Sequence, residues 1–307
     1  MKLVVTGATG FLGVPLVAAL RARGDAVTVL TRSAANARKF GAGVTVVEAD
    51  LETPGRWCAA LAGHDAILHL AGESVAAKRW TARQKQIIRD SRIEATRTIV
   101  EAVQALPIAE RPRTLIAMSG VDYYPYASNQ HDFDDDEVTE ADPPSESFLG
   151  RVCRDWEKEA AAAEAFGTRV VRMRTGIVFG EGGPMDQMSA PFRLFAGGKI
   201  GDGRQWVSWI HRDDALAALL AALDDARYTG PINLVTDSAR NADVAKAIGH
   251  QLHRPSWLPV PGFALEVAVG EFAEVLLNGR RVVPTRLREL GFTWKLPTLA
   301  AALAYLH

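Results

Sequence analysis

The chain has 307 residues, of which 48% are hydrophobic and 23% charged, ordinary values for a soluble globular protein. At about 150 residues per domain, this length favours two domains, or one large domain with an appendage. The formal net charge of −1 argues against a protein that binds nucleic acid by bulk electrostatics.

Other classes are excluded by what the sequence lacks. It holds no uncharged apolar run of about 18 residues, which excludes a membrane span. Its first residues do not have the pattern of a signal peptide. The two cysteines, Cys58 and Cys153, are too few for a disulfide scaffold or a cysteine-based zinc site. We therefore expect a cytoplasmic protein with no nucleic-acid or membrane partner and no bound metal.

Segments typical of strands and of helices alternate through the first 180 residues. Apolar, β-branched runs predict strands at residues 2–6, 26–31, 44–48, 66–70, 114–119 and 169–179. Helical spacing or composition predicts helices at residues 11–23, 81–106, from 148 to 166, and at 214–223. Strands that alternate with helices indicate a parallel sheet that is covered on both faces.

The pattern changes near residue 180, where glycine-rich loops begin and prolines become frequent. We place a domain boundary there. Residues 1–180 are expected to form the first domain, with 212–236 returning to it. Residues 181–211 and 237–307 are expected to form a smaller C-terminal lobe on the substrate side.

An acidic segment, residues 132–142, contains seven acidic residues in eleven. Like charges at this density repel one another, which favours a solvated surface loop. The alternative is a lid or a loop that faces a partner.

A glycine-rich loop follows the first predicted strand and begins the first predicted helix. Gly7 allows the turn, Gly10 lets the backbone approach a pyrophosphate, and Gly13 lets the helix pack close to the sheet. The helix N-terminus then presents unpaired N–H groups to phosphate. This pattern predicts a dinucleotide site in a Rossmann-type, doubly wound parallel sheet.

The residues after the next strands predict which dinucleotide is bound. Thr31 and Arg32 stand where an NAD enzyme has a carboxylate, and a guanidinium favours the 2′-phosphate of NADP(H) over NAD(H). The alternative is a solvent-exposed arginine at a strand end. Asp50 and Leu51 are placed to meet the adenine. The segment Leu70-Ala71-Gly72 ends the fourth strand, and its small residues let the backbone pass close to a ribose.

At this point the whole chain resembles the extended short-chain dehydrogenase/reductases, and among them an NAD(P)-dependent epimerase-like subfamily. The more specific motifs are Ala71-Gly72-Glu73, Lys78-Arg79-Trp80-Thr81, Ser91-Arg92, Arg174-Thr175-Gly176, Gly201-Asp202-Gly203-Arg204-Gln205 and Trp209-Ile210-His211. The end of the chain, from about residue 254 to 303, is similar to a small C-terminal domain whose role is not established. The resemblance implies NADP contacts at Thr31, Arg32, Leu70, Ala71, Arg92 and Arg174. With the loop residues and Glu73, the candidate cofactor set also holds Gly7, Thr9, Gly10, Phe11, Leu12, Gly13, Asp50, Leu51 and Gly72.

Helical spacing supports the role of Arg92. It points into the apolar stripe formed by Ile88, Ala95 and Ile99, where a guanidinium needs a carboxylate or a ligand phosphate. Both alternatives remain open from the sequence. Arg174 ends the sixth strand on the ligand side of the sheet, and a structural ion pair is its alternative.

The superfamily's catalytic Tyr-x-x-x-Lys motif is absent. No tyrosine of the chain has a lysine four residues later. On the helix that should carry the motif, Leu149 replaces the tyrosine and Cys153 the lysine. A lysine at this spacing would favour tyrosinate and so allow proton exchange near neutral pH.

Two hypotheses follow from this absence. In the first, catalysis has moved to Ser119, Tyr123 and Tyr124, just beyond the fifth strand, and the protein is a reductase or epimerase-type oxidoreductase. In the second, the chain is a cofactor-binding regulatory or interaction protein with little turnover, and the two tyrosines serve packing. Cys153 is either a thiol of the site or a small buried residue.

A second ligand region is expected beside the first. Basic residues cluster at positions 78–92, and they form either a solvated helix face or an anion-binding rim. The candidate substrate-binding residues are Lys78, Arg79, Trp80, Arg204 and Trp206. The expected partner is a sugar-like or anionic small molecule, and the protein is expected to be a monomer or a homodimer.

Overall fold

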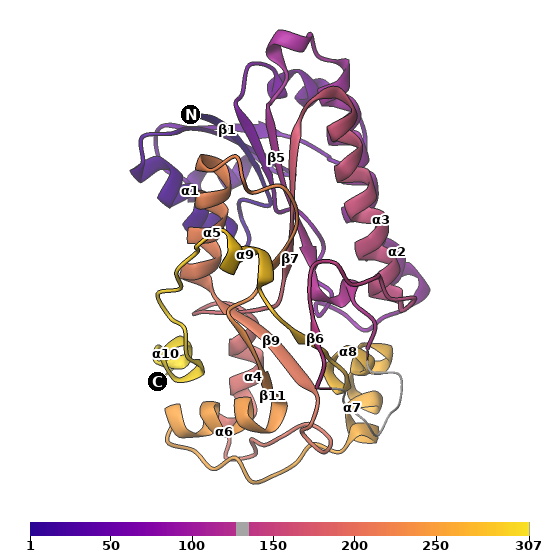
Figure 1. Ribbon diagram of the computed structural model, residues 1–307, viewed down its shortest axis with the longest axis vertical. Helices are drawn as coiled ribbons and strands as arrows, with labels where there is room; N and C mark the ends of the chain where they lie inside the picture. The colour runs from indigo at the N-terminus through magenta and orange to yellow at the C-terminus, as the bar shows by residue number, and fades with distance from the viewer. Residues whose placement is uncertain (127–134, 307) are drawn as a thin grey trace.

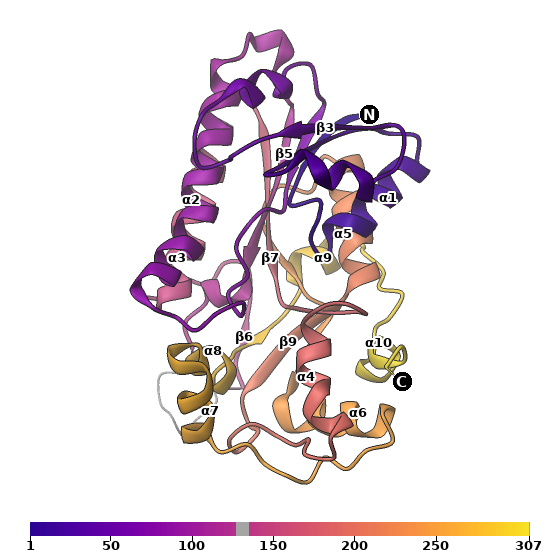
Figure 2. The same cartoon turned by 180° about the vertical axis from the view of Figure 1, so that it is seen from behind.

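The computed structural model describes residues 1–126 and 135–306, and it shows a large upper part with a smaller lobe below it (Figures 1 and 2). The larger part is built on seven parallel strands in the order β3-β2-β1-β4-β5-β7-β10. Their bounds are Val44–Glu48, Ala26–Thr31, Lys2–Thr6, Ala66–His69, Thr114–Gly120, Arg169–Thr175 and Gly230–Leu234. This is the doubly wound Rossmann-type sheet that the sequence predicts.

Helices cover both faces of this sheet, which explains why its strands are almost continuously apolar. On one side lie α1 (Gly13–Ala22) and α5 (Arg212–Asp224), and on the other α2 (Ala82–Ala105) and α3 (Phe148–Ala161) (Figure 1). Along β1, Val5 joins the core under α1 and α5, while Val4 joins the core under α2 and α3. The alternation of side chains along a strand thus serves two cores.

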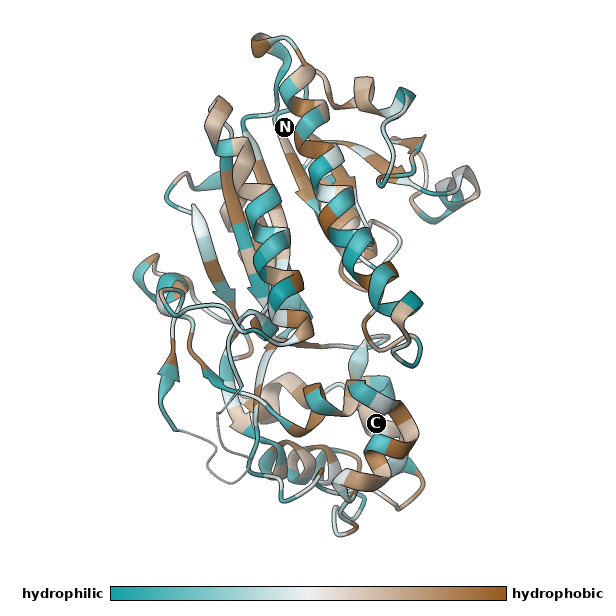
Figure 3. Cartoon of the chain, turned by 90° about the vertical axis from the view of Figure 1, so that its right-hand side faces the viewer, coloured by the Kyte–Doolittle hydropathy of each residue, from teal (hydrophilic) through white to brown (hydrophobic). Residues whose placement is uncertain are grey.

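The surface pattern of α2 and α3 fits this arrangement. Figure 3 shows mostly hydrophilic turns on the outer side of the two long helices and hydrophobic strands behind them. Ile88, Ala95 and Ile99, the predicted stripe of α2, are at most 2% exposed. The helix is therefore held to the sheet by its apolar face.

The predicted strand at residues 169–179 is two strands. β7 ends at Thr175, and β8 (Ile177–Phe179) belongs to a second sheet of order β11-β9-β8. Gly176 makes the crossing, since a Cβ there would lie 2.5 Å from the carbonyl oxygen of Ser208. The chain thus leaves the main sheet a little before residue 180.

The smaller lobe forms around this second sheet. Its strands β9 (Trp206–His211) and β11 (Asp237–Arg240) are antiparallel, and Phe179 stacks on Trp209 at a centroid distance of 5.5 Å. The other elements of the lobe are α4 (Pro184–Arg193), α6 (Asn241–Gln251), α7 (Gly262–Val269), α8 (Ala273–Leu277) and α10 (Leu299–Leu303). Near the end of the chain, α9 (Thr285–Glu289) returns to β10, and Leu287 is fully buried in the core of the main sheet.

Short 3-10 turns fill several connections; they span Ala34–Lys39, Arg56–Leu61, Ile108–Glu110, Val121–Tyr123, Ala162–Phe166 and Gly270–Phe272.

The acidic segment is only partly a loop. Its residues 132–134 lie outside the described residues. β6 (Glu137–Val138) pairs with β12 (Arg281–Val282), and the Glu140 carboxylate accepts hydrogen bonds from the backbone N–H groups of Asn233 and Arg286. The second half of the segment therefore joins the C-terminal residues to β10, which the charge pattern did not predict.

Candidate functional site

The glycine loop has the close approaches that require glycine. Gly7 has φ +65°, and a Cβ there would lie 2.6 Å from the carbonyl of Leu70. A Cβ on Gly13 would lie 2.2 Å from the Gly7 carbonyl oxygen. Gly10, by contrast, is exposed. The loop thus packs on the end of β4 with two glycines and leaves the third open to a ligand.

The N-terminus of α1 is available to an anion. Its N-cap residue is Leu12, and no side chain accepts a hydrogen bond from the first turn. In the first turn Val14 donates to the Gly10 carbonyl at 3.1 Å and Pro15 has no N–H, so the turn offers an anion the Gly13 N–H and the helix dipole. Phe11 packs instead toward the smaller lobe, where a Cβ on Gly183 would lie 2.5 Å from its ring. Thr9 stays half-buried in the turn.

At the end of β2 the two candidate residues differ. The Thr31 hydroxyl accepts a hydrogen bond from Asn36 at 3.1 Å. Arg32 is exposed and makes no hydrogen bond or ion pair within the described part of the chain. Asp50 uses its carboxylate in a local turn with Glu52 and Thr53, and Leu51 packs on the core under α2. Of these residues, Arg32 alone presents a charge that no neighbour has paired.

A chain of buried hydrogen bonds positions the loop after β4. The Ala71 N–H donates to Thr6 Oγ1, and His69 lies between Thr6 and Thr96 at 2.7 and 3.0 Å. Because Thr96 donates its own hydrogen to the Arg92 carbonyl, it must accept from His69 Nε2, which leaves Nδ1 to accept from Thr6. Burial, and then the charge of Arg92, lowers the pKa of His69 to about 4. The imidazole is thus neutral and links the loop after β4 to α2.

Arg92 lies against the end of β4 without a carboxylate partner. Its Nη1 donates to the carbonyls of Glu73 and Ile88 at 2.8 and 3.1 Å, and the guanidinium lies over the Trp156 ring at 5.3 Å. A Cβ on Gly72 would lie 3.2 Å from Arg92 Cζ. Within the described residues no hydrogen bond or ion pair joins Arg92 to an acidic side chain, so the internal ion pair is not formed. Burial lowers the pKa of Arg92.

Arg174 has the opposite arrangement. Its Nε and Nη2 donate to both carboxylate oxygens of Glu157 at 2.7 and 2.8 Å, and Nη1 donates to the Tyr124 hydroxyl at 2.8 Å. Arg174 and Glu157 are 3% and 4% exposed. The structure therefore engages this guanidinium in the ion pair that the sequence left as the alternative to cofactor binding.

The expected catalytic residues join this ion pair. The Ser119 hydroxyl donates to Glu157 at 2.8 Å, and the Tyr124 hydroxyl donates to Asn233 at 2.6 Å. Tyr124 is 1% exposed, and burial raises its pKa despite the neighbouring Arg174. We call Arg174, Glu157, Ser119 and Tyr124 the closed cluster. Its polar groups satisfy one another, which leaves Ser119 and Tyr124 no free hydroxyl to offer a substrate.

Tyr123 also serves this cluster. Its ring lies 3.5 Å from Arg174 Cζ and meets Tyr124 edge to face, with centroids 5.4 Å apart. The residue is partly buried in the short turn after β5. A cation–π contact of this kind favours a packing role.

The helix positions of the missing motif are buried. Leu149 is 4% exposed and packs in a cluster with Trp80 and Ile88. Cys153 is 6% exposed, and burial, with the nearby Asp122, raises its pKa to about 12. A thiol with this pKa is not a nucleophile at neutral pH.

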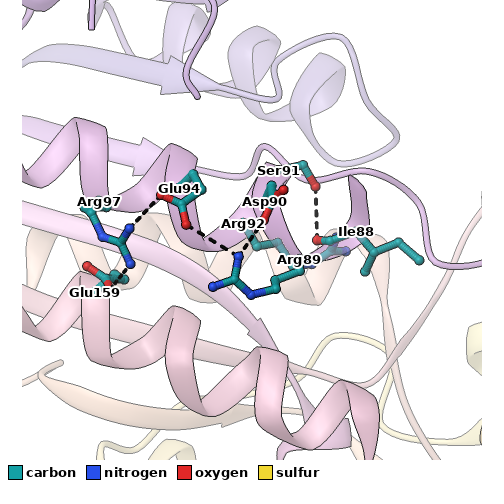
Figure 4. Close-up of polar contacts among 8 residues, drawn as sticks. All are labelled: Ile88, Arg89, Asp90, Ser91, Arg92, Glu94, Arg97 and Glu159. Atoms are coloured by element: carbon teal, nitrogen blue, oxygen red, sulfur yellow. Dashed lines mark hydrogen bonds and ion pairs between the residues drawn. The ribbon is translucent and has the colours of Figure 1, made fainter. Parts of the chain in front are cut away.

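The second ligand region is less open than the sequence suggests. Trp80 is 6% exposed and packs on Phe148 and Phe272. Arg79 donates to the Val267 carbonyl at 2.9 Å, and Lys85 pairs with Glu271. Lys78 and Arg204 are exposed, while Arg240 and Arg281 cover the ring of Trp206. Figure 4 shows that Arg89 and Arg97 on α2 are held by acidic neighbours on α2 and α3.

A pocket of about 710 Å³ lies between the residues 200–205 and the helices α7 and α8. Four carboxylates line it, those of Asp202, Glu266, Glu271 and Glu274. Since like charges repel, this lining opposes an anionic ligand. The basic residues of α2 and the acidic residues of this pocket meet at the Lys85–Glu271 pair.

Comparison with known proteins agrees with the fold. Residues 3–234 match the model of the NAD dependent epimerase/dehydratase family, and residues 260–306 match a domain of unknown function, DUF1731. The chain belongs to the NAD dependent epimerase/dehydratase family. This membership is consistent with the resemblance to extended short-chain dehydrogenase/reductases that the motifs suggested.

Individual members of the family are similar over nearly the whole chain. A chloroplastic SDR39U1 homologue of Arabidopsis thaliana is 38% identical over 96% of this chain and 83% of its own length. The epimerase family protein YfhF of Bacillus subtilis is 36% identical over 100% and 98%. The crystal structure of human epimerase family protein SDR39U1 with NADPH superposes with a TM-score of 0.84, at 31% identity, covering 100% of this chain and 99% of that one.

Sequence reasoning missed four residues that shape the site. His69 interrupts the apolar run of β4, and a histidine in a buried strand is a signal that it needs polar partners. Glu157 pairs with Arg174 through a contact that no local pattern of the sequence marks. The Tyr126 hydroxyl donates to Asp122 at 3.0 Å, in the segment that follows the predicted fifth strand.

Proposed function

We propose that the chain binds NADP(H) in preference to NAD(H) and acts as an epimerase- or reductase-type oxidoreductase. The observation that carries the cofactor preference is the unpaired, exposed guanidinium of Arg32 at the end of β2. It would meet a 2′-phosphate, while the N-terminus of α1 would meet the pyrophosphate. The human relative named with NADPH supports this choice.

The remaining cofactor contacts follow from the same placement. Gly10 would face the pyrophosphate, and the backbone of Leu70, Ala71 and Gly72 would pass the ribose beside Arg92. In this proposal residues 1–180 with 212–236 hold the cofactor, and residues 181–211 with 237–307 hold the substrate. Arg174 would act at a distance, by keeping the end of β5 in place through the closed cluster.

The cofactor preference is tested by titration with NADPH and NADH. Arg32→Ala should weaken NADPH binding by about 10- to 100-fold, the value of one or two charge-assisted hydrogen bonds, and leave NADH binding unchanged. Arg113→Ala is the matched control, because Arg113 is exposed at the amino end of β5. Equal affinity of the unmodified chain for NADH and NADPH would contradict the preference.

The substrate remains a small molecule of sugar-like character in this proposal. NADPH, when bound, supplies a hydride. The acidic pocket beside α7 and α8 makes a neutral molecule a better fit than the anionic one that the basic residues suggested. A hydride-transfer screen that compares neutral and acidic sugars, free and as nucleotide conjugates, tests this choice.

The second candidate function, a cofactor-binding regulatory protein with little turnover, is favoured by a specific observation. Leu149 and Cys153 fill the motif positions, and Ser119 and Tyr124 are engaged in the closed cluster. Tight NADPH binding with no transfer across the same screen would support this candidate. The expected cytoplasmic location and the oligomeric state stay predictions; in the described residues no helix is long and apolar enough to cross a membrane.

A further inference from the structure

A second group of an arginine, a carboxylate and a tyrosine lies next to the closed cluster. Tyr126 donates a hydrogen bond to Asp122 Oδ1 at 3.0 Å. A Cβ placed on Gly120 would lie 3.6 Å from both Asp122 Oδ2 and Cys153 Sγ. We call Arg92, Asp122, Tyr126 and Cys153 the open cluster, because no ion pair closes it within the described residues.

The open cluster lies between the end of β5 and the α3 position where the missing motif would have its lysine. Gly120 ends β5, and Cys153 is the residue of α3 that replaces the lysine of the missing motif. The Asp122 carboxylate therefore stands beside the helix turn where proton chemistry would be expected. Tyr126 and Asp122 are only partly buried, in contrast to Tyr124 at 1% exposure.

Burial opposes the ionisation of both groups of this pair. Burial raises the pKa of the Asp122 carboxyl, while Tyr126 and Arg92 lower it in part. Burial, and then Asp122, raises the pKa of the Tyr126 phenol, with a smaller effect from Glu274 of α8. Glu274 also lines the acidic pocket, so the charge of that pocket acts on Tyr126.

We propose that Tyr126, with Asp122 behind it, is the proton donor of this site and replaces the Tyr-x-x-x-Lys pair. This inference rests on the proposed oxidoreductase function. In a reduction, the carbonyl carbon gains a hydride with its electron pair, and NADPH becomes NADP⁺. The carbonyl oxygen takes the proton of Tyr126, Tyr126 takes the proton of a protonated Asp122, and Asp122 regains one from water.

Arg92 has a defined part in this step. Proton transfer leaves a carboxylate at Asp122, and the guanidinium of Arg92 stabilises that charge. Arg92 is thus a positioning residue, as is Asp122, and Tyr126 is the group that meets the substrate.

The test uses the full chain, NADPH and phenanthrenequinone as a reactive carbonyl probe in single-turnover reactions. Tyr126→Phe should lower the rate of hydride transfer by about 100- to 10,000-fold, as expected for loss of a general acid. Asp122→Asn should also slow transfer and change its solvent deuterium isotope effect. Tyr228→Phe is the matched control, because Tyr228 is a buried tyrosine on the far side of the core, and it should keep the full rate.

Two readouts do not depend on turnover. The affinity for NADPH should change by less than about twofold in Tyr126→Phe, which separates proton donation from binding. The tyrosinate absorbance, titrated to about pH 11, should be the same with and without Tyr126, because its phenol keeps the proton. A titration step near neutral pH that disappears in Tyr126→Phe would overturn the proposal.

The outcomes distinguish this inference from the function on which it rests. Failure of NADPH to bind would overturn the proposed function and this inference together. Tight NADPH binding with no transfer to the probe in any form of the chain would likewise overturn the oxidoreductase function together with this inference. Tight NADPH binding with full transfer in Tyr126→Phe would overturn this inference alone.

Discussion

The closed and open clusters each contain an arginine, a carboxylate and a tyrosine, and they differ in how these groups pair. In the closed cluster, Glu157 binds Arg174 through both carboxylate oxygens and also accepts a hydrogen bond from the Ser119 hydroxyl. In the open cluster, the hydrogen bonds of Arg92 go to backbone carbonyls, and Asp122 accepts a hydrogen bond from the Tyr126 hydroxyl. A buried charge that is fully paired holds a fold in one geometry, whereas charges that are unpaired can respond to a ligand.

The largest expected effect comes from breaking the closed cluster. Glu157→Ala leaves the Arg174 guanidinium buried and unpaired, which should lower the free energy of unfolding by about 3–5 kcal/mol in a urea titration. Glu159→Ala is the control, since its ion pair with Arg97 is partly exposed to solvent and should be worth about 0–1 kcal/mol. Equal losses in the two variants would show that the buried ion pair of the closed cluster stabilises the fold no more than a partly exposed ion pair does.

The next effect concerns His69, whose hydrogen-bond chain ends at the Arg92 carbonyl. Its pKa is about 4 in the folded chain against 6.5 as an ordinary value. The unfolded chain therefore binds the proton first, and stability should fall as the pH drops from 6.5 to 4. The loss should reach about 3 kcal/mol and then level off. His69→Gln should lose this His69-dependent part, and a pH profile that matches the unmodified chain would show that His69 is not its source.

The smallest effect contrasts the two tyrosines. Tyr124→Phe removes a buried hydroxyl that donates to Asn233 Oδ1 and accepts from Arg174 Nη1, which should cost about 1–3 kcal/mol of unfolding free energy. Tyr126→Phe should cost less than about 1 kcal/mol, because it removes a single hydrogen bond, the one to Asp122, from a residue that is only partly buried. Thermal unfolding of both variants measures the difference. A larger loss in Tyr126→Phe than in Tyr124→Phe would show that the open cluster, and not the closed one, contributes more to stability.

The sheet and the glycine loop could be predicted from the sequence because they depend on local patterns. Strands of β-branched residues, helices of regular period, and the spacing of Gly7, Gly10 and Gly13 are each written within about 20 residues of chain. The crossing at Gly176 was missed because apolar residues continue on both sides of it.

The pairing of charges could not be predicted in the same way. Tyr124 finds Asn233 across 109 positions, and Arg174 finds Glu157 on a neighbouring element. Nothing in the local sequence of Arg92 and Arg174 says which of them has a carboxylate within reach. That distinction depends on how the end of β5 packs between α3 and β10, and it decides which residues of the site are free to act.

The return of α9 to β10 has a consequence for the integrity of the chain. Leu287 belongs to the segment that matches the second family domain, yet its side chain is fully buried in the core of the first. The two matched regions therefore share one hydrophobic interior, and a gene fragment that ends before α9 would encode a Rossmann sheet with an open flank. Heat should consequently melt the intact protein in a single cooperative transition, as one evolutionary and folding unit.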